Sequence, residues 1–506
     1  MALAELSQQE RKEDAPLASE DYVVKTMPPI LGKLDMTTTY LMAIFFIVNA
    51  VTAANGGAAA FTYLILGGVT FFIPCAIATA QLGYMFPHEG SLYNWTHKAL
   101  GSYWSFFIGF CSWFPGVLVM VAGAATALGF LQGLNSTWLV APWQQGLAIL
   151  IILTFSGFMS LQRYRTVQNV INIVVGLVFV AVVLIGISAV VWLAKGHQSA
   201  TNFADLGGWN IKWSPTTGNI NLFGLITLAY LGTEVPLNMG GEMRGAGHDE
   251  GTRRRIVTSH LLWGTILVFV GYFVATLALL IVQGSAAGSI GSFSLISTVD
   301  MVLGKTLGDI TAVCIICFFV MIPVVYNCAF ARLLLVAGID QRLPVNIGKL
   351  NKHRVPANAM IFQVVIAMVL TVLTFMIAPY VVNLGKPIDL ASEVYNITQA
   401  CATLVWAIST AFFFINLAIF YYRDKAAFHR VRIFPMPILV ASTIIGPIAC
   451  LLAIVDSLFI SWIPLVSNQN WSYIVGGLTM VCLIFATIGG ILATSEANWQ
   501  SIEQEK

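Results

Sequence analysis

The sequence predicts an all-α integral membrane protein with twelve transmembrane helices. Of its 506 residues, 58% are hydrophobic and only 9% are charged, whereas soluble domains carry about 25% charged residues. Apolar runs of about 20 residues, long enough to cross a bilayer as helices, recur along the chain and lack the strict alternation of membrane β-strands. A water-soluble enzyme is therefore excluded, and the lipid bilayer is the expected partner of most of the surface.

Each predicted helix is an apolar run bounded by polar, glycine or proline residues. Residues 1–35 are polar and mixed in charge, which indicates a cytoplasmic tail rather than a cleaved signal peptide. A second short tail is expected at 496–506. The twelve predicted helices between the tails are 37–55, 58–84, 102–131, 143–161, 167–194, 220–242, 256–282, 309–337, 357–379, 391–422, 434–460 and 472–494.

Basic residues predict the orientation, because Lys and Arg are retained on the cytoplasmic side. With the amino terminus inside, all but four of the 25 basic residues lie on the cytoplasmic side. The four exceptions are Lys195, Lys212, Lys305 and Lys386. We therefore expect both termini in the cytoplasm and the protein in the plasma (inner) membrane.

Two predicted helices contain features that interrupt a regular helix. The first holds Asn49 and Thr52 among small residues, and the sixth contains the sequence Gly-Thr-Glu-Val-Pro at 232–236. Interrupted segments that open two successive groups of five helices are typical of inverted-repeat transporters, with the binding site at the breaks. The predicted transporter domain is 36–495, divided into a first repeat at 36–195, a second at 219–422 and two last helices at 434–494.

Glu234 is the one acidic residue well inside a predicted span. An ionisable group there is costly and therefore a candidate for function, and burial disfavours its charged form. We expect it to act in coupling or gating and to make transport depend on pH. The alternative is a structural carboxylate that holds the break in shape by hydrogen bonds.

Other chemistry finds little support in the sequence. The eight cysteines all lie in apolar runs, and the Cys314/Cys317 pair has no His, Asp or Glu beside it, so no metal site is expected. No histidine lies mid-membrane, and the HExxH, GxSxG and Walker A patterns are absent. No basic run interleaved with aromatics is present for nucleic acid. We expect no enzyme activity, no cofactor and no nucleic-acid partner.

Three stretches carry motifs. A basic residue, a turn of the DG.LP type and a vP.nA sequence follow one another in Ala331–Met360, ARLLLVAGIDQRLPVNIGKLNKHRVPANAM. A Gly followed by two spaced Glu residues occurs in Ala229–Arg244, AYLGTEVPLNMGGEMR. A P..GG.Y.W pattern occurs in Ala80–Trp104, AQLGYMFPHEGSLYNWTHKALGSYW. Together they resemble the amino acid–polyamine–organocation superfamily. FFIPCAIATAQLG and LAYLGTE look most like its glutamate/GABA antiporter branch.

This resemblance implies a LeuT-like 5+5 inverted repeat followed by helices 11 and 12, and a substrate site at the two breaks. It places the first break at Tyr40–Ile44, where the backbone amides of Met42, Ala43 and Ile44 would hold a substrate carboxylate. The α-amino group would be held by carbonyls of four residues, Tyr230, Leu231, Gly232 and Thr233.

The resemblance also implies roles for three side chains. Glu234 matches a carboxylate that senses protons or acts as a gate. Tyr326 matches the aromatic residue of helix 8 that caps the substrate, and Tyr230 stands near the position of a gate aromatic in helix 6. Selectivity is expected to depend on these tyrosines, and the α-carboxylate is expected to be common to good substrates.

The predicted function is secondary active transport of amino acids, by exchange of one amino acid for a related amino acid or amine. Helix 5, at 167–194, has no lysine before its outer end, so a lysine-based proton relay is not expected. The alternatives are a proton-coupled or uniport permease for an amino acid or GABA, and a receptor or scaffold derived from a transporter. The specific substrate, the coupling ion and the oligomeric state stay open.

Overall fold

The computed structural model describes residues 17–212, 218–245, 249–381, 387–462 and 466–504. Within these ranges the chain is helical and has no β-strand, only two isolated bridges. The predicted all-α class is therefore confirmed. Ten helical stretches of the described chain are long and apolar enough to cross a membrane.

The helices that form the spans are, in chain order, α3 (Lys33–Ile44), α4 (Asn49–Ala54), α5 (Ala59–Gly67), α6 (Ile73–Met85), α8 (Ser102–Leu134), α9 (Pro142–Ser160), α10 (Tyr164–Ala194), α11 (Asn221–Ala229), α12 (Glu250–Val282), α15 (Lys305–Ile339), α16 (Ala357–Thr371), α17 (Ala378–Val381), α18 (Pro387–Arg423), α20 (Met436–Phe459) and α21 (Asn468–Gln504). A π-helical turn joins α5 to α6, and another joins α16 to α17. Shorter helices that the sequence analysis did not predict are α2 (Ala18–Thr26), α7 (Ser91–Leu100), α13 (Ala287–Ile290), α14 (Ser294–Leu303) and α19 (Lys425–Val431).

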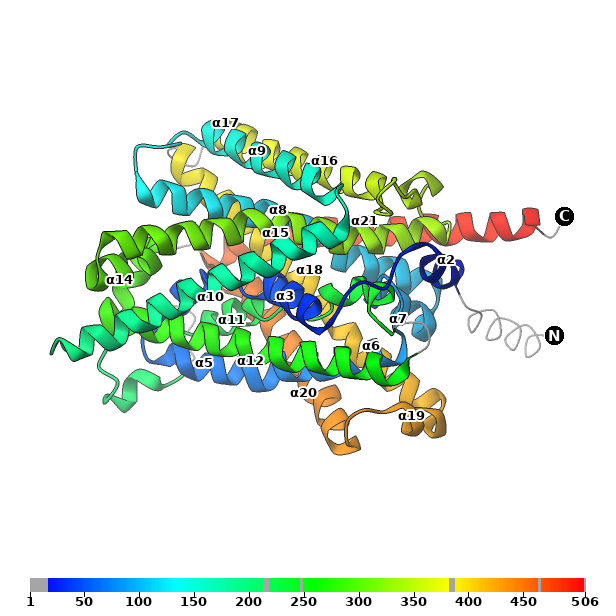
Figure 1. The fold of residues 1–506 in the computed structure, drawn as a ribbon, viewed down its shortest axis with the longest axis horizontal. Coiled ribbons are helices and arrows are strands. Elements are labelled where there is room, and N and C mark those ends of the chain that lie inside the picture. The colour runs from blue at the N-terminus through cyan, green and yellow to red at the C-terminus, as the bar shows by residue number, and fades with distance from the viewer. Residues whose placement is uncertain (1–16, 213–217, 246–248, 382–386, 463–465, 505–506) are drawn as a thin grey trace.

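The long helices run along one axis of the molecule (Figure 1). Helix α2, the first described helix, and the end of α21 lie at the same end of the bundle as α7, and α14 lies at the opposite end. We call these the termini side and the far side. Helix α15 runs through the centre and packs closely on α8, where Gly123 leaves room for Ile322. Small residues at such crossings let membrane helices approach each other.

Both predicted interruptions are present in the structure. Helices α3 and α4 are separated by residues 45–48, and α11 ends at Ala229, before an irregular stretch and a 3₁₀ turn at Val235–Asn238. The predicted position of the first break was wrong, because α3 continues through Ile44. Residues 40–44 contain neither glycine nor proline, so nothing in their backbone ends the helix there.

The predicted amino-terminal tail contains helix α2, which is docked on the termini side. Its Glu20 forms an ion pair with Lys98 of α7 at 2.8 Å, and Val23 and Met27 pack against Leu335 of α15. Helix α21 continues to Gln504, into the segment predicted as the second tail. The first sixteen residues lie outside the described chain.

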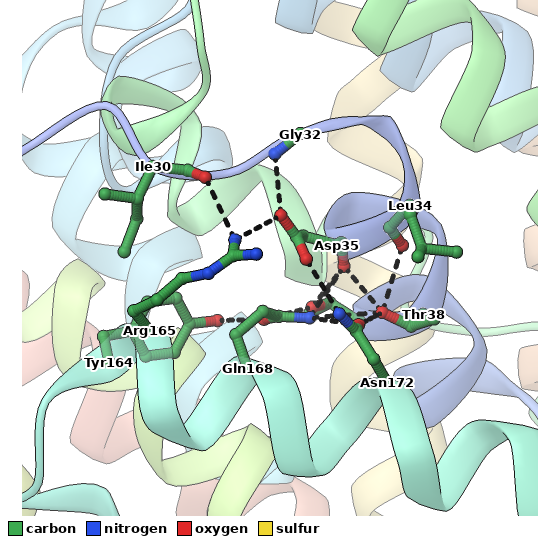
Figure 2. A network of polar contacts seen from close by, with 10 residues as sticks. Ile30, Gly32, Leu34, Asp35, Thr38, Tyr164, Arg165, Gln168 and Asn172 are labelled. Carbon is green, nitrogen blue, oxygen red and sulfur yellow. Dashed lines mark hydrogen bonds and ion pairs between the residues drawn. The ribbon is translucent and has the colours of Figure 1, made fainter.

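A polar network joins the start of α3 to α10 (Figure 2). The carboxylate of Asp35 accepts hydrogen bonds from Arg165 and Asn172, both at 2.9 Å. The Asn172 side-chain oxygen in turn accepts bonds from Thr38 at 2.5 Å and from Gln168 at 3.0 Å. Asn172 therefore holds together groups from both helices, and the two helices are fixed to each other at this end.

Replacing Asn172 with leucine is expected to destabilise the protein by about 1–3 kcal/mol, because buried polar groups lose a partner that leucine cannot replace. A lower midpoint in a thermal unfolding curve of the purified protein would measure this. Ile173→Leu is the control on the same helix, since Ile173 is largely exposed to the lipid side and should change stability by less than about 0.5 kcal/mol. Equal midpoints for Asn172→Leu and Ile173→Leu would contradict the role given to the network.

Candidate functional site

A cavity of about 390 Å³ lies between the two helix breaks. Its lining includes polar side chains from several helices: Asn49, Thr52, Asn55, Thr126, Asn221 and Gln399. Ser292 and Trp462, from connections at the far side, also line it. The cavity therefore extends from the breaks toward the far side.

Between the breaks and the termini side, paired backbone segments close the bundle. Leu31 pairs with Met243 and Glu89 pairs with Met239 through isolated backbone bridges. The Leu31 amide donates to the carbonyl of Glu242, and the amide of Arg244 donates to the carbonyl of Leu31, both at 3.0 Å. We call these paired segments the inner barrier.

At the first break, the carbonyls of α3 already have partners. Tyr326 donates its hydroxyl hydrogen to the carbonyl of Ala43 at 2.6 Å, and Tyr272 donates to the carbonyl of Ile44 at 2.9 Å. The amides of Ile47 and Val48 have no hydrogen-bond partner in the described part of the chain. Amide donors are thus available after the break rather than before it.

This geometry corrects where the amide donors lie. Met42, Ala43 and Ile44 belong to the last turn of α3, and amides there bond to the preceding turn, whereas the last carbonyls of a helix are the free groups. Ala43 and Ile44 do line the cavity, but Met42 does not.

At the second break, the four predicted residues divide into two groups. Leu231 lines the cavity, and Gly232 adopts a φ of +101°, a conformation that favours glycine. The Thr233 hydroxyl lies 3.0 Å from that of Thr79, on the side of α6. Tyr230 stacks on Phe72 with ring centroids 4.5 Å apart, so it packs against neighbouring helices and does not line the cavity.

Glu234 lies directly behind the cavity wall and is fully buried. Its Oε1 accepts hydrogen bonds from the indole of Trp406 at 2.9 Å and from the hydroxyl of Ser112 at 3.3 Å. Its Oε2 has no partner in the described structure. Trp406 itself lines the cavity, so one side chain connects the buried carboxylate to the space for a ligand.

Two aromatic side chains from different helices meet at the cavity. Tyr326 of α15 and Trp406 of α18 both line it, with ring centroids 6.2 Å apart in an edge-to-face arrangement. Tyr326 was predicted from the helix 8 motif, whereas Trp406 was not predicted. Nothing in the sequence around Trp406 marks it, because its importance comes from contacts with distant segments.

A second cavity of about the same volume lies on the side of the bundle. Its lining comes mainly from α8, α15, α16 and α21 and is almost entirely apolar, with Phe110, Trp113 and Phe362 among its residues. It offers no convergent polar groups for an amino acid. No cluster of three His, Cys, Asp or Glu that could hold a metal ion is found among the described residues.

Most of the chain matches one known protein family. A model of the amino acid permease family matches residues 34–488. The chain belongs to this family. The match includes both helix breaks and all the lining residues of the cavity, and it confirms the predicted superfamily.

The relatives of this permease are transporters by name. It is 24% identical over 459 residues to a glutamate/gamma-aminobutyrate antiporter of Lactococcus lactis subsp. lactis, which covers 85% of this chain and 82% of the relative. It is 22% identical over 236 residues to a gamma-aminobutyric acid permease of Bacillus subtilis, covering 46% of this chain and 48% of the relative. An uncharacterized transporter of Legionella pneumophila is 24% identical over 61% of this chain and 66% of its own length.

These names confirm that the permease is not an enzyme, and its spanning helices make it an integral membrane protein. The matched stretch spans about half of the Bacillus relative and just under two thirds of the Legionella relative.

Proposed function

We propose that this permease is a secondary active transporter that exchanges an amino acid for a related amino acid or amine by alternating access. The observation that carries the proposal is the polar cavity at the two helix breaks, which extends to one side of the bundle and is closed on the other. A receptor or scaffold derived from a transporter would not need a polar cavity at the breaks. The names of the relatives support amino acids or their amines as substrates.

The two breaks offer complementary groups to a zwitterion. The unpaired amide of Val48, a residue that lines the cavity, suits a carboxylate, because free backbone N–H groups bind anions by geometry and by their partial charge. The carbonyl of Leu231, which also lines the cavity, accepts no hydrogen bond in the described chain and suits an ammonium group. Ala43, Ile44 and the other residues of the first break then shape the space between these groups.

Selectivity among ligands is proposed to come from side chains that line the cavity. Tyr326 and Trp406 supply aromatic surface, and Asn49 and Asn221 supply amide groups. Tyr326 is held in place by its bond to the carbonyl of Ala43, so it is a fixed part of the wall. Tyr230 contributes indirectly, by supporting the break from behind.

The membrane orientation follows from the basic residues. With the termini side in the cytoplasm of the cell, the cavity is accessible from outside and the inner barrier is closed. This is the state that receives external substrate. The proposed membrane is the plasma (inner) membrane.

Exchange predicts that efflux of substrate depends on external substrate. Liposomes containing the purified permease are loaded with one labelled amino acid at a time, including glutamate and GABA, and diluted into buffer with or without the unlabelled compound. We expect efflux to be at least tenfold faster into substrate, because the empty carrier returns slowly. Equal efflux under both conditions would indicate uniport, and efflux driven only by a pH gradient would indicate proton coupling.

A further inference from the structure

Three ionisable side chains are buried together in the inner barrier. Glu89, Glu242 and Arg332 are each at most 2% exposed. The Nε of Arg332 donates to Oε1 of Glu242 at 2.8 Å, and its guanidinium lies 4.5 Å from the ring centre of Tyr164. Glu242 therefore has a cation of its own.

Glu89 has no such partner. Both of its carboxylate oxygens are buried, and no side chain donates a hydrogen bond to them in the described structure. Its side chain lies against Gly241, where an added Cβ would be 3.3 Å from Oε1 of Glu89. The carboxyl group is therefore enclosed by the backbone of the segment that closes the barrier.

The backbone around Glu89 belongs to the barrier itself. Glu89 pairs with Met239, and the amide of the next residue, Gly90, donates to the carbonyl of Asn238 at 3.1 Å. Ser91 donates to the side-chain oxygen of Asn238 at 2.7 Å. In the alternating access proposed above, opening of the barrier separates these segments and brings water to Glu89.

The charge balance of the cluster disfavours a negative charge on Glu89 in addition to the one on Glu242. One guanidinium faces two carboxyl groups, and a buried charge without a partner is costly. Burial raises the pKa of Glu89 well above its usual range and the negative charge of Glu242 raises it further, whereas Arg332 and the backbone amides of Glu242 and Gly241 lower it only in part. Glu242 and Arg332 are the charged groups that act on Glu89. The elements around them also carry Tyr164, Glu20, His88, His97 and Lys98.

We propose that Glu89 is a proton-binding site of the inner barrier, occupied while the barrier is closed and emptied when it opens to the termini side. This site is separate from Glu234 at the cavity, and it is independent of which substrate is carried. The proton comes from the termini side and returns to it, so Glu89 senses the pH of that compartment and carries no net proton across the membrane.

The direction of the effect follows from proton linkage. The closed state binds one more proton than the open state at pH values between the ordinary pKa of a glutamate and the raised one. Acidification therefore favours the closed barrier. A rise in pH favours opening, by up to tenfold per pH unit for one proton.

The test measures opening directly instead of transport. Leu31 is fully buried in the closed barrier, so a Leu31→Cys variant of the full-length permease in lipid nanodiscs reacts with a dilute maleimide only when the barrier opens. Lys349→Cys, at an exposed position on the termini side, corrects for the pH dependence of thiol reactivity. Protein without either substitution gives the background from the native cysteines.

With Glu89 present, the Leu31→Cys rate divided by the Lys349→Cys rate should rise by up to tenfold per pH unit between pH 5.5 and 8.5. Adding Glu89→Gln, which imitates the protonated acid, should make the ratio low and constant. Adding Glu234→Gln should leave the dependence of this ratio on pH, which we call the slope, unchanged. This result would show that the proton of the inner barrier does not bind at Glu234 of the cavity.

Three results would overturn the proposal. A ratio independent of pH with Glu89 present would mean that Glu89 has the same protonation in both states. A slope that survives Glu89→Gln but disappears in Glu242→Gln would assign the proton to Glu242. A slope that disappears in Glu234→Gln would assign it to the cavity. The first measurement needs no substitution at Glu89, so it stands even if Glu89→Gln fails to fold.

Discussion

Replacing Gly232 with alanine is expected to lower the rate of transport at least tenfold in a protein that still folds. Gly232 has a φ of +101°, where a residue with a Cβ is strained by about 1–3 kcal/mol. The added Cβ would also lie 3.2 Å from the indole ring of Trp406. That ring must shift, and its hydrogen bond to Glu234 is then disturbed. Strain of about 1.4 kcal/mol in one state of the cycle corresponds to a tenfold change in rate.

The measurement is uptake of labelled substrate into liposomes with equal amounts of each protein, after gel filtration has shown that each is monodisperse. Gly129→Ala is the matched control, because a Cβ at Gly129 in α8 meets no atom within 4 Å. Its transport should be unchanged. A normal rate for Gly232→Ala would show that neither the backbone at this break nor the position of Trp406 limits transport.

The helices could be predicted because their signal is local. Most predicted spans agree with the structure within a few residues, as for 143–161 against Pro142–Ser160 and 357–379 against Ala357–Val381. An apolar run of sufficient length has no other stable form in lipid. The break in the sixth helix was predicted for the same reason, since Gly232 and Pro236 mark it in the sequence.

The break in the first helix could be placed only approximately. No glycine or proline lies between Tyr40 and Val48, so the end of α3 is set by tertiary contacts. Tyr326 and Tyr272 bind the carbonyls of Ala43 and Ile44 from other helices. These contacts replace the hydrogen bonds that the two carbonyls would accept in a continuing helix. They join residues more than 200 positions apart.

The same limit applies to the partners of the buried carboxylates. Glu234 could be singled out by its depth, but its bond to Trp406 spans 172 positions of the chain. The pair of Arg332 and Glu242 spans 90 positions, within two motifs that were recognised separately. A buried carboxylate can thus be recognised from its position in an apolar run, whereas the groups that compensate its burial come from distant parts of the fold.

Glu234→Gln is expected to remove most of the pH dependence of uptake, with the permease still folded. The carboxyl is fully buried, no cation contacts it in the described chain, and its Oε2 has no partner. A charge is costly there unless the group gains a proton. The Gln oxygen can accept the same bonds from Trp406 and Ser112, so the wall of the cavity is preserved while the titrating group is lost.

Uptake is measured with the external pH varied from 5 to 8 and the internal pH fixed, so that Glu234 is tested from the side on which the cavity opens. The permease should show a rate that varies several-fold over this range, and Glu234→Gln should show a nearly constant rate. Glu250→Gln is the control, because the Glu250 side chain is 67% exposed and its loss should leave the profile intact. An unchanged profile in Glu234→Gln would leave this carboxylate with a structural role only, in which its bonds to Trp406 and Ser112 hold the second break in shape.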